Sequence, residues 1–80
     1  MPIYHLHLHN AITVALDEEG HDLPDIEAAV AHAVAGIRGL LGHEAIRGKI
    51  DLRGQIDITD EHGAVLRTVQ FKDAVEIITR

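Results

Sequence analysis

The sequence predicts a small α+β domain in which one helix packs on one face of an antiparallel sheet. Apolar and polar residues alternate near both ends of the chain, one long central stretch has helical periodicity, and short turn-forming segments separate these stretches. The predicted order is β-β-α-β-β. Residues 1–80 are expected to form a single domain, because this length suits one hydrophobic core.

The first two strands are predicted on either side of a turn at Asn10-Ala11. Strand alternation begins at Ile3 and continues to His9, and a second alternating run covers Ile12–Leu16. Asp17–Gly20 follows and is expected to be a solvated acidic turn. Gly20 is expected there because glycine adopts a positive φ at little cost.

A helix is predicted after Leu23-Pro24-Asp25, since Asp25 is a good N-cap and Pro24 cannot lie inside a helix. The helix ends either at Gly42 or at Arg47 with Gly48 as the stop signal. Its apolar face recurs at steps of three and four residues: Ile26, Val30, Ala33, Val34, Ile37, Leu40 and Leu41.

The opposite helix face contains small residues and histidines. They are Ala28, His32, Ala35, Gly36, Gly39 and His43. Such a face can be an exposed, alanine-rich surface, or it can allow the close approach of a second chain.

Two further strands are predicted towards the C-terminus. Ile50–Thr59 has one apolar face, with a bulge expected at Gly54. A hairpin loop at Asp60–Gly63 leads to a strand over Ala64–Phe71, with Val65, Val69 and Phe71 on one side. Residues 72–78 could form a last helical turn or another strand.

Composition and motifs exclude several classes of function. The chain has no cysteine, so thiolate chemistry and disulfides are excluded, and a cytoplasmic setting is the default. Its net charge is −6 and its seven Lys and Arg are scattered, which argues against nucleic-acid binding. No apolar run is long enough to span a membrane. There is no serine, and no motif surrounds the threonines, so we expect no enzymatic activity, no catalytic residue and no cofactor.

Three histidines in the first predicted strand are the candidate metal ligands. His5, His7 and His9 alternate with apolar residues and therefore share one strand face. Because His5 and His9 lie about 13 Å apart along a strand, only two of the three can bind one ion. Asp51 or Asp57 could supply a carboxylate ligand from a neighbouring strand. Histidines on a solvent-facing sheet surface or in a dimer contact would produce the same pattern.

Three stretches of the sequence also follow a known family pattern. They are Met1-Pro2-Ile3-Tyr4-His5-Leu6-His7, Asp17-Glu18-Glu19-Gly20 followed by Leu23-Pro24-Asp25 and an alanine-rich helix, and Thr59-Asp60-Glu61-His62-Gly63 within the last hairpin. Together they resemble a family of short, uncharacterised bacterial proteins classed as a domain of unknown function. The resemblance implies a stand-alone cytoplasmic domain and no particular activity.

The chain departs from this pattern in its first strand. Asn10-Ala11 replaces the usual Asp-Gly turn, and His5 and Leu6 replace two aromatic residues. His5 therefore has no counterpart in the family pattern, which weakens a site of three histidines common to the family.

The function expected from the sequence is that of a small non-enzymatic interaction or regulatory module that acts as a homodimer. A domain of 80 residues buries little surface alone, and a second copy could supply the missing burial. A protein partner could also bind at a sheet edge. The alternative is a metal-binding protein that uses His5, His7 and His9.

Overall fold

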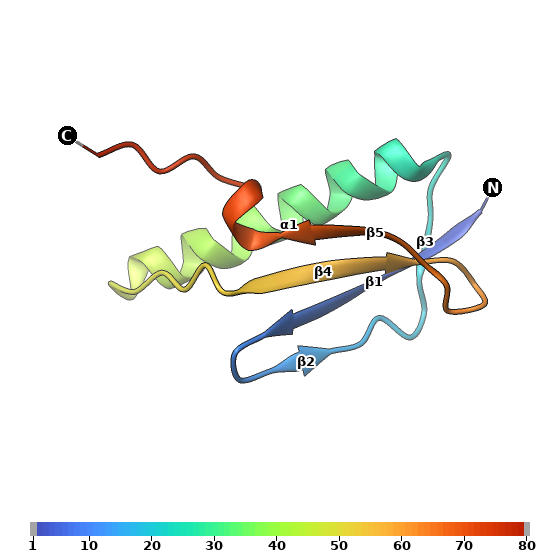
Figure 1. Ribbon diagram of the computed structural model, residues 1–80, viewed down its shortest axis with the longest axis horizontal. Helices are drawn as coiled ribbons and strands as arrows, with labels where there is room; N and C mark the ends of the chain where they lie inside the picture. Colours follow the sequence, from blue (N-terminus) through green and yellow to red (C-terminus); the bar gives the residue numbers. More distant parts are fainter. Residues whose placement is uncertain (1, 80) are drawn as a thin grey trace.

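The computed structural model describes residues 2–79 and has two layers, a five-stranded antiparallel sheet and one long helix (Figure 1). The elements follow one another as β1 (Ile3–Asn10), β2 (Val14–Ala15), β3 (His21–Asp22), α1 (Ile26–Ile46), β4 (Gly54–Thr59), β5 (Val65–Gln70) and the 3-10 turn η1 (Phe71–Asp73). The helix covers one face of the sheet, and we call the other face the open face. The predicted α+β class, with a helix on one side of a small antiparallel sheet, is confirmed.

The sheet is built around β1 and β4, its two central strands. Its order is β2-β1-β4-β5, and β3 pairs with β1 on the same edge as β2. In the β1–β4 ladder, His5 faces Thr59, His7 faces Asp57 and His9 faces Gln55. Since strand side chains alternate, these six residues lie together on the open face, while Tyr4, Ile56 and Ile58 point to the helix and are buried.

The predicted second strand is shorter than expected, and a strand that was not predicted follows it. Only Val14–Ala15 pairs with β1, because the side chain of Asn10 accepts the backbone N–H groups of Ile12 and Thr13 at 2.9 and 2.7 Å. That local turn takes Ile12 out of the ladder. The chain then leaves β1 and returns to it as β3, His21–Asp22. Gly20, just before β3, has the expected positive φ of 79°.

The helix begins and ends at predicted residues. The Asp25 side chain accepts the N–H of Ala28 at 2.8 Å, which confirms its role as N-cap. Of the two predicted ends, the later one is correct: α1 runs through Gly42 to Ile46, Arg47 is the C-cap and Gly48 has a φ of 83°.

The C-terminal strands differ from the prediction at three points. β4 begins at Gly54 instead of Ile50, because the Asp51 side chain accepts the Arg53 N–H at 3.0 Å and holds a local turn. The bulge lies between Ile58 and Thr59 instead of at Gly54. Across this bulge Val65 pairs with Thr59, so Val65 lies on the open face and not beside Val69, which pairs with Ile56.

The end of the last predicted strand turns away from the sheet. Phe71 opens η1, where its ring is buried against Gly54. Of the two alternatives for residues 72–78, the last helical turn is correct for Lys72 and Asp73, which lie in η1, and residues 74–79 have neither helix nor strand.

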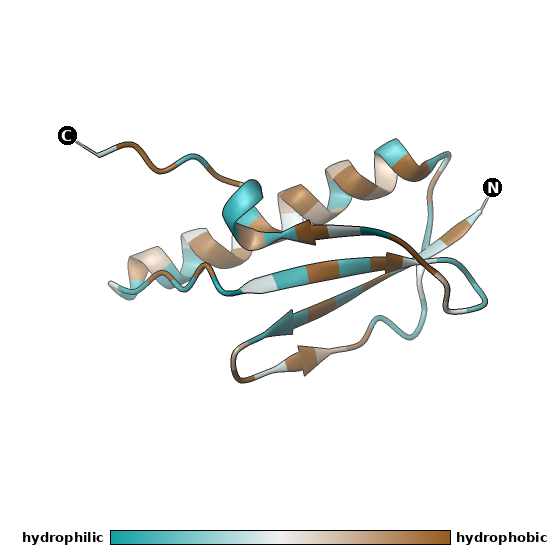
Figure 2. Ribbon diagram, viewed as in Figure 1, coloured by the Kyte–Doolittle hydropathy of each residue, from teal (hydrophilic) through white to brown (hydrophobic). Residues whose placement is uncertain are grey.

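The core lies between the helix and the covered face of the sheet. Among the described residues, its buried members are Tyr4, Ala29, Ala33, Ile37, Leu41, Ile56, Ile58, Phe71 and Ala74. Figure 2 shows the alternation of apolar and polar residues along β4, and apolar residues in the projecting C-terminal segment. The core is therefore small and mostly aliphatic.

Candidate functional site

The open face of the sheet holds the histidines that the sequence analysis selected. His5, His7 and His9 are all partly buried in β1, and their rings lie on the side away from α1. The His5 and His7 rings are stacked, with their centroids 5.9 Å apart. His9 lies two residues beyond His7 on the same strand face and contacts Asp57 instead. The predicted common face is confirmed, but the three imidazoles do not converge on one point.

His5 and His7 hold the backbone of Asp17. His5 Nδ1 lies 2.7 Å from the Asp17 carbonyl oxygen, and the Asp17 N–H donates to His7 Nδ1 at 3.0 Å. A carbonyl needs a donor and an N–H needs an acceptor, so His5 has its proton on Nδ1 and neutral His7 has its proton on Nε2. Nε2 of His7 lies 3.5 Å from the Thr59 hydroxyl. The Nδ1 atoms of His5 and His7 therefore both form hydrogen bonds to the backbone of Asp17.

The Asp17 carboxylate completes the edge of the sheet between β2 and β3. Leu6 lies between Tyr4, which pairs with β3, and Leu8, which pairs with β2. Its N–H has no strand partner on that edge and donates instead to Asp17 Oδ2 at 3.1 Å. The Gly20 N–H donates to Oδ1 at 3.0 Å. Asp17 therefore replaces the backbone carbonyl that a continuous strand would have supplied.

Asp17 also interacts with His21, at the start of β3. His21 Nε2 lies 3.3 Å from Asp17 Oδ2, and the His21 ring lies 4.5 Å from that of His32 on α1. Desolvation by burial opposes ionisation of Asp17, but the N–H donors of Leu6 and Gly20 and the charges of His21 and His5 outweigh it. The pKa of the Asp17 carboxyl is therefore lowered from its usual value. Asp17 was predicted to be part of a solvated turn, and that prediction is wrong.

A second polar group lies along the same face, around Asp57. His9 Nε2 is 3.0 Å from Asp57 Oδ2, while Gln55 Nε2 and the Thr68 hydroxyl both donate to Oδ1 at 2.9 Å. These contacts join β1, β4 and β5 across the open face. Both carboxylate oxygens of Asp57 therefore have a partner within the fold.

The metal-ligand candidates do not form a coordination site within the fold as described. Between residues 2 and 79, no group of three or more His, Asp or Glu side chains is arranged to hold a metal ion. Asp57 reaches His9 but not the stacked pair His5 and His7, and Asp51 binds the Arg53 guanidinium at 2.9 and 3.0 Å. Metal binding by His5, His7 and His9 stays a prediction that the structure alone does not test.

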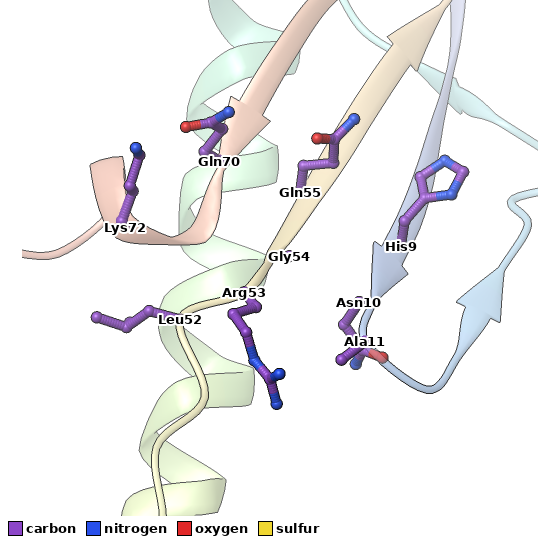
Figure 3. Close-up of a pocket in the computed structure, with 9 residues that line it drawn as sticks. All are labelled: His9, Asn10, Ala11, Leu52, Arg53, Gly54, Gln55, Gln70 and Lys72. Carbon is purple, nitrogen blue, oxygen red and sulfur yellow. The ribbon is translucent and has the colours of Figure 1, made fainter.

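A shallow hollow of about 490 Å³ lies at the end of the sheet, where β1 ends and β4 begins (Figure 3). It is lined by His9, Asn10, Ala11, Leu52, Arg53, Gly54, Gln55, Gln70 and Lys72. None of these residues is acidic, so the hollow suits an anion better than a cation. Figure 3 shows, however, that the Arg53 side chain points away from Lys72, and its guanidinium is already paired with Asp51. The hollow thus offers two separate cations and no converging set of ligands.

Sequence reasoning found the histidine face but missed the residue that organises it. Asp17 lies ten residues after His7 and twelve after His5, so no local spacing connects them. The one available signal was Asp17 followed three residues later by Gly20, a spacing at which an aspartate side chain can accept a backbone N–H. That spacing would have predicted the turn but not its attachment to β1.

Among residues 2–79 no helix combines the length and apolarity that crossing a membrane requires.

Comparisons with curated proteins and with solved structures gave no match. A comparison with protein-family models matched residues 3–72 to a domain of unknown function, DUF6894, which confirms the expected membership of an uncharacterised family. The match spans well over half of the sequence, from β1 to the second residue of η1. The chain therefore belongs to the DUF6894 family.

Proposed function

We propose that this protein is a small, non-enzymatic interaction module that acts as a homodimer and binds through the free edge of its sheet. The observation that supports this proposal is that β5 lies at the edge of the sheet and is exposed. Within the described residues β5 pairs with β4 alone, and five of its six residues are exposed. The outer edge of a strand of this length presents a row of backbone donors and acceptors to which another strand can add.

The apolar surface of the chain supports a partner. Among the described residues, nine large apolar side chains are exposed, as many as the residues of the buried core: Ile12, Val14, Leu16, Ile46, Ile50, Val65, Leu66, Ile77 and Ile78. Single exposed apolar residues are common, but a domain of 80 residues with so small a core gains stability when a second chain covers part of this surface.

The polar groups favour an interaction module over an enzyme. Both carboxylate oxygens of Asp17 and of Asp57 accept contacts within the fold, and these contacts hold the edge loop and join three strands. Groups used in this way stabilise a surface and are not available for acid–base work. A cytoplasmic location, a regulatory role and a further protein partner belong to the same proposal.

The proposal is tested by a charge placed on the β5 edge. Val65→Lys puts an ammonium beside the exposed strand, and Ile46→Lys puts the same charge on an equally apolar exposed residue at the end of α1. Light scattering of the two variants and the parent should give a dimer for the parent and for Ile46→Lys, and a shift towards monomer for Val65→Lys. A parent chain that is monomeric would refute the proposal.

A further inference from the structure

We propose that the segment Val75–Thr79 of each copy adds as a strand to the outer edge of β5 in the second copy, so that the two chains exchange these segments reciprocally. This inference rests on the homodimer proposed above and names its interface. It starts from a segment that leaves the body of the molecule after η1 (Figure 1). Its Ile77 and Ile78 side chains are 58% and 79% exposed.

The composition of Val75–Thr79 is that of a strand. Four of its five residues are β-branched, namely Val75, Ile77, Ile78 and Thr79, and such residues favour extended pairing. Glu76–Thr79 nevertheless has no strand partner within the described chain. The Cα radius of gyration, 13.1 Å, exceeds the roughly 12 Å of a compact domain of this length, as expected if one segment projects.

The base of the segment is fixed, which gives the segment a defined direction. Phe71 and Ala74 are buried, and Arg38 Nε on α1 donates to the Ala74 carbonyl at 2.7 Å. The chain therefore passes from β5 through η1 along one edge of the molecule and then continues outward in roughly the same direction (Figure 1). An anchored segment loses less conformational entropy on pairing than a free one.

A two-fold axis near η1 would bring each segment alongside the β5 strand of the other copy. The segment would then run antiparallel to that strand, because the axis reverses the direction of β5. The lengths also agree: five residues extend over about 16 Å and the six residues of β5 over about 20 Å. One closed symmetric contact would thus use both segments and both β5 edges.

Charge and apolarity match along this contact. Arg67 is the only charged residue of β5, and Glu76 is the only charged residue of Val75–Thr79. The exposed apolar residues of β5, Val65 and Leu66, would meet Ile77 and Ile78. Pairing of opposite charges together with apolar contact is what favours one strand alignment over its alternatives.

The other edge of the sheet is a poor acceptor for such a segment. β2 and β3 have two residues each, and the loop held by Asp17 separates them. A five-residue strand would find no continuous row of backbone groups there. Because β5 is the longer edge, it is the one that can accept a five-residue strand.

Two measurements on the full chain test this exchange. The first compares the dimer dissociation constant of the parent with those of Ile77→Asp and of Ile12→Asp, a control at the opposite edge whose side chain is 92% exposed. Ile77→Asp should weaken the dimer by about tenfold or more, and Ile12→Asp should leave it unchanged. The second mixes isotope-labelled and unlabelled chains and should give NMR contacts between the methyl groups of Ile77 or Ile78 and β5 of the other copy.

The outcomes separate this inference from the proposed function. A dimer that survives Ile77→Asp, or one without contacts between the segment and β5, overturns the exchange and leaves the homodimer standing. Loss of the dimer in Ile12→Asp alone would likewise overturn it and move the interface to the β2 edge. A monomeric parent overturns both. Unchanged helical circular dichroism in each variant shows that folding is intact.

Discussion

Replacing Asp17 should destabilise the fold more than replacing any neighbouring acidic residue. In Asp17→Ala the N–H groups of Leu6 and Gly20 lose the carboxylate that accepts them at 3.1 and 3.0 Å. A hydrogen bond to a charged group contributes about 1.5–3 kcal/mol. Because the Asp17 side chain retains 18% of its accessible surface, the lower value applies to each bond, and we expect a loss of about 3 kcal/mol in the free energy of unfolding.

Urea unfolding at pH 7, followed by circular dichroism at the helical band, measures this loss. Glu18→Ala is the matched control, because it removes the same charge from the adjacent exposed residue. It should change the free energy of unfolding by less than about 0.5 kcal/mol. Asp17→Asn retains one oxygen and should lie midway. A loss below about 1 kcal/mol in Asp17→Ala, or one equal to that of Glu18→Ala, would refute the role assigned to Asp17.

The same variant has a defined pH dependence. The native pKa of Asp17 is lowered, so its stabilisation is fully present above the unfolded pKa of about 3.9 and is lost as the pH falls through the native pKa. The difference in the free energy of unfolding between the parent and Asp17→Ala should therefore shrink as the pH falls below about 4. A difference that stayed unchanged down to about pH 2 would contradict the contacts described for Asp17.

Three further predictions concern other parts of the fold. Gly54→Ala should destabilise the protein by about 1–3 kcal/mol in urea unfolding, because the new Cβ would lie 2.6 Å from the ring of Phe71; unchanged stability would show that the ring moves freely. Gly39→Ala should stabilise it by up to about 1 kcal/mol in the same assay, because the new Cβ would meet no atom within 4 Å beyond its chain neighbours and the backbone of its own helix; a loss of stability or of the dimer would instead indicate that a second chain packs on this helix face. The Asp51 carboxyl should titrate with a pKa of about 2 by NMR, since the Arg53 side chain donates to it, and Arg53→Gln should raise that pKa; a titration that ignores the substitution would disprove the pairing.

The regular elements could be predicted from the sequence because each has a local cause. The alternation in β1, the Asp25 N-cap and the glycine after the helix are each read from a few neighbouring residues. The errors arise where a side chain competes with the backbone ladder. Asn10 shortens β2 and Asp51 delays β4, and neither competition changes the pattern of apolar residues from which the strands were predicted.

The candidate site was predictable only in part for a related reason. Residues on one strand face follow from a period of two, so the grouping of the histidines was correct. Asp17 reaches that face through a loop whose path depends on β3 pairing with β1, a contact between residues far apart in the sequence. The bulge in the β4–β5 pairing is a similar case, since it depends on the fit between two strands and not on either alone.

The proposed homodimer is tested most directly by sedimentation equilibrium of the unmodified chain over a range of concentrations. We predict a mass twice the 8.7 kDa of one chain at about 100 µM, falling towards a single chain on dilution. A mass of one chain at every concentration would contradict the account, because the free β5 edge and the exposed Val75–Thr79 segment would then have no second copy to cover them.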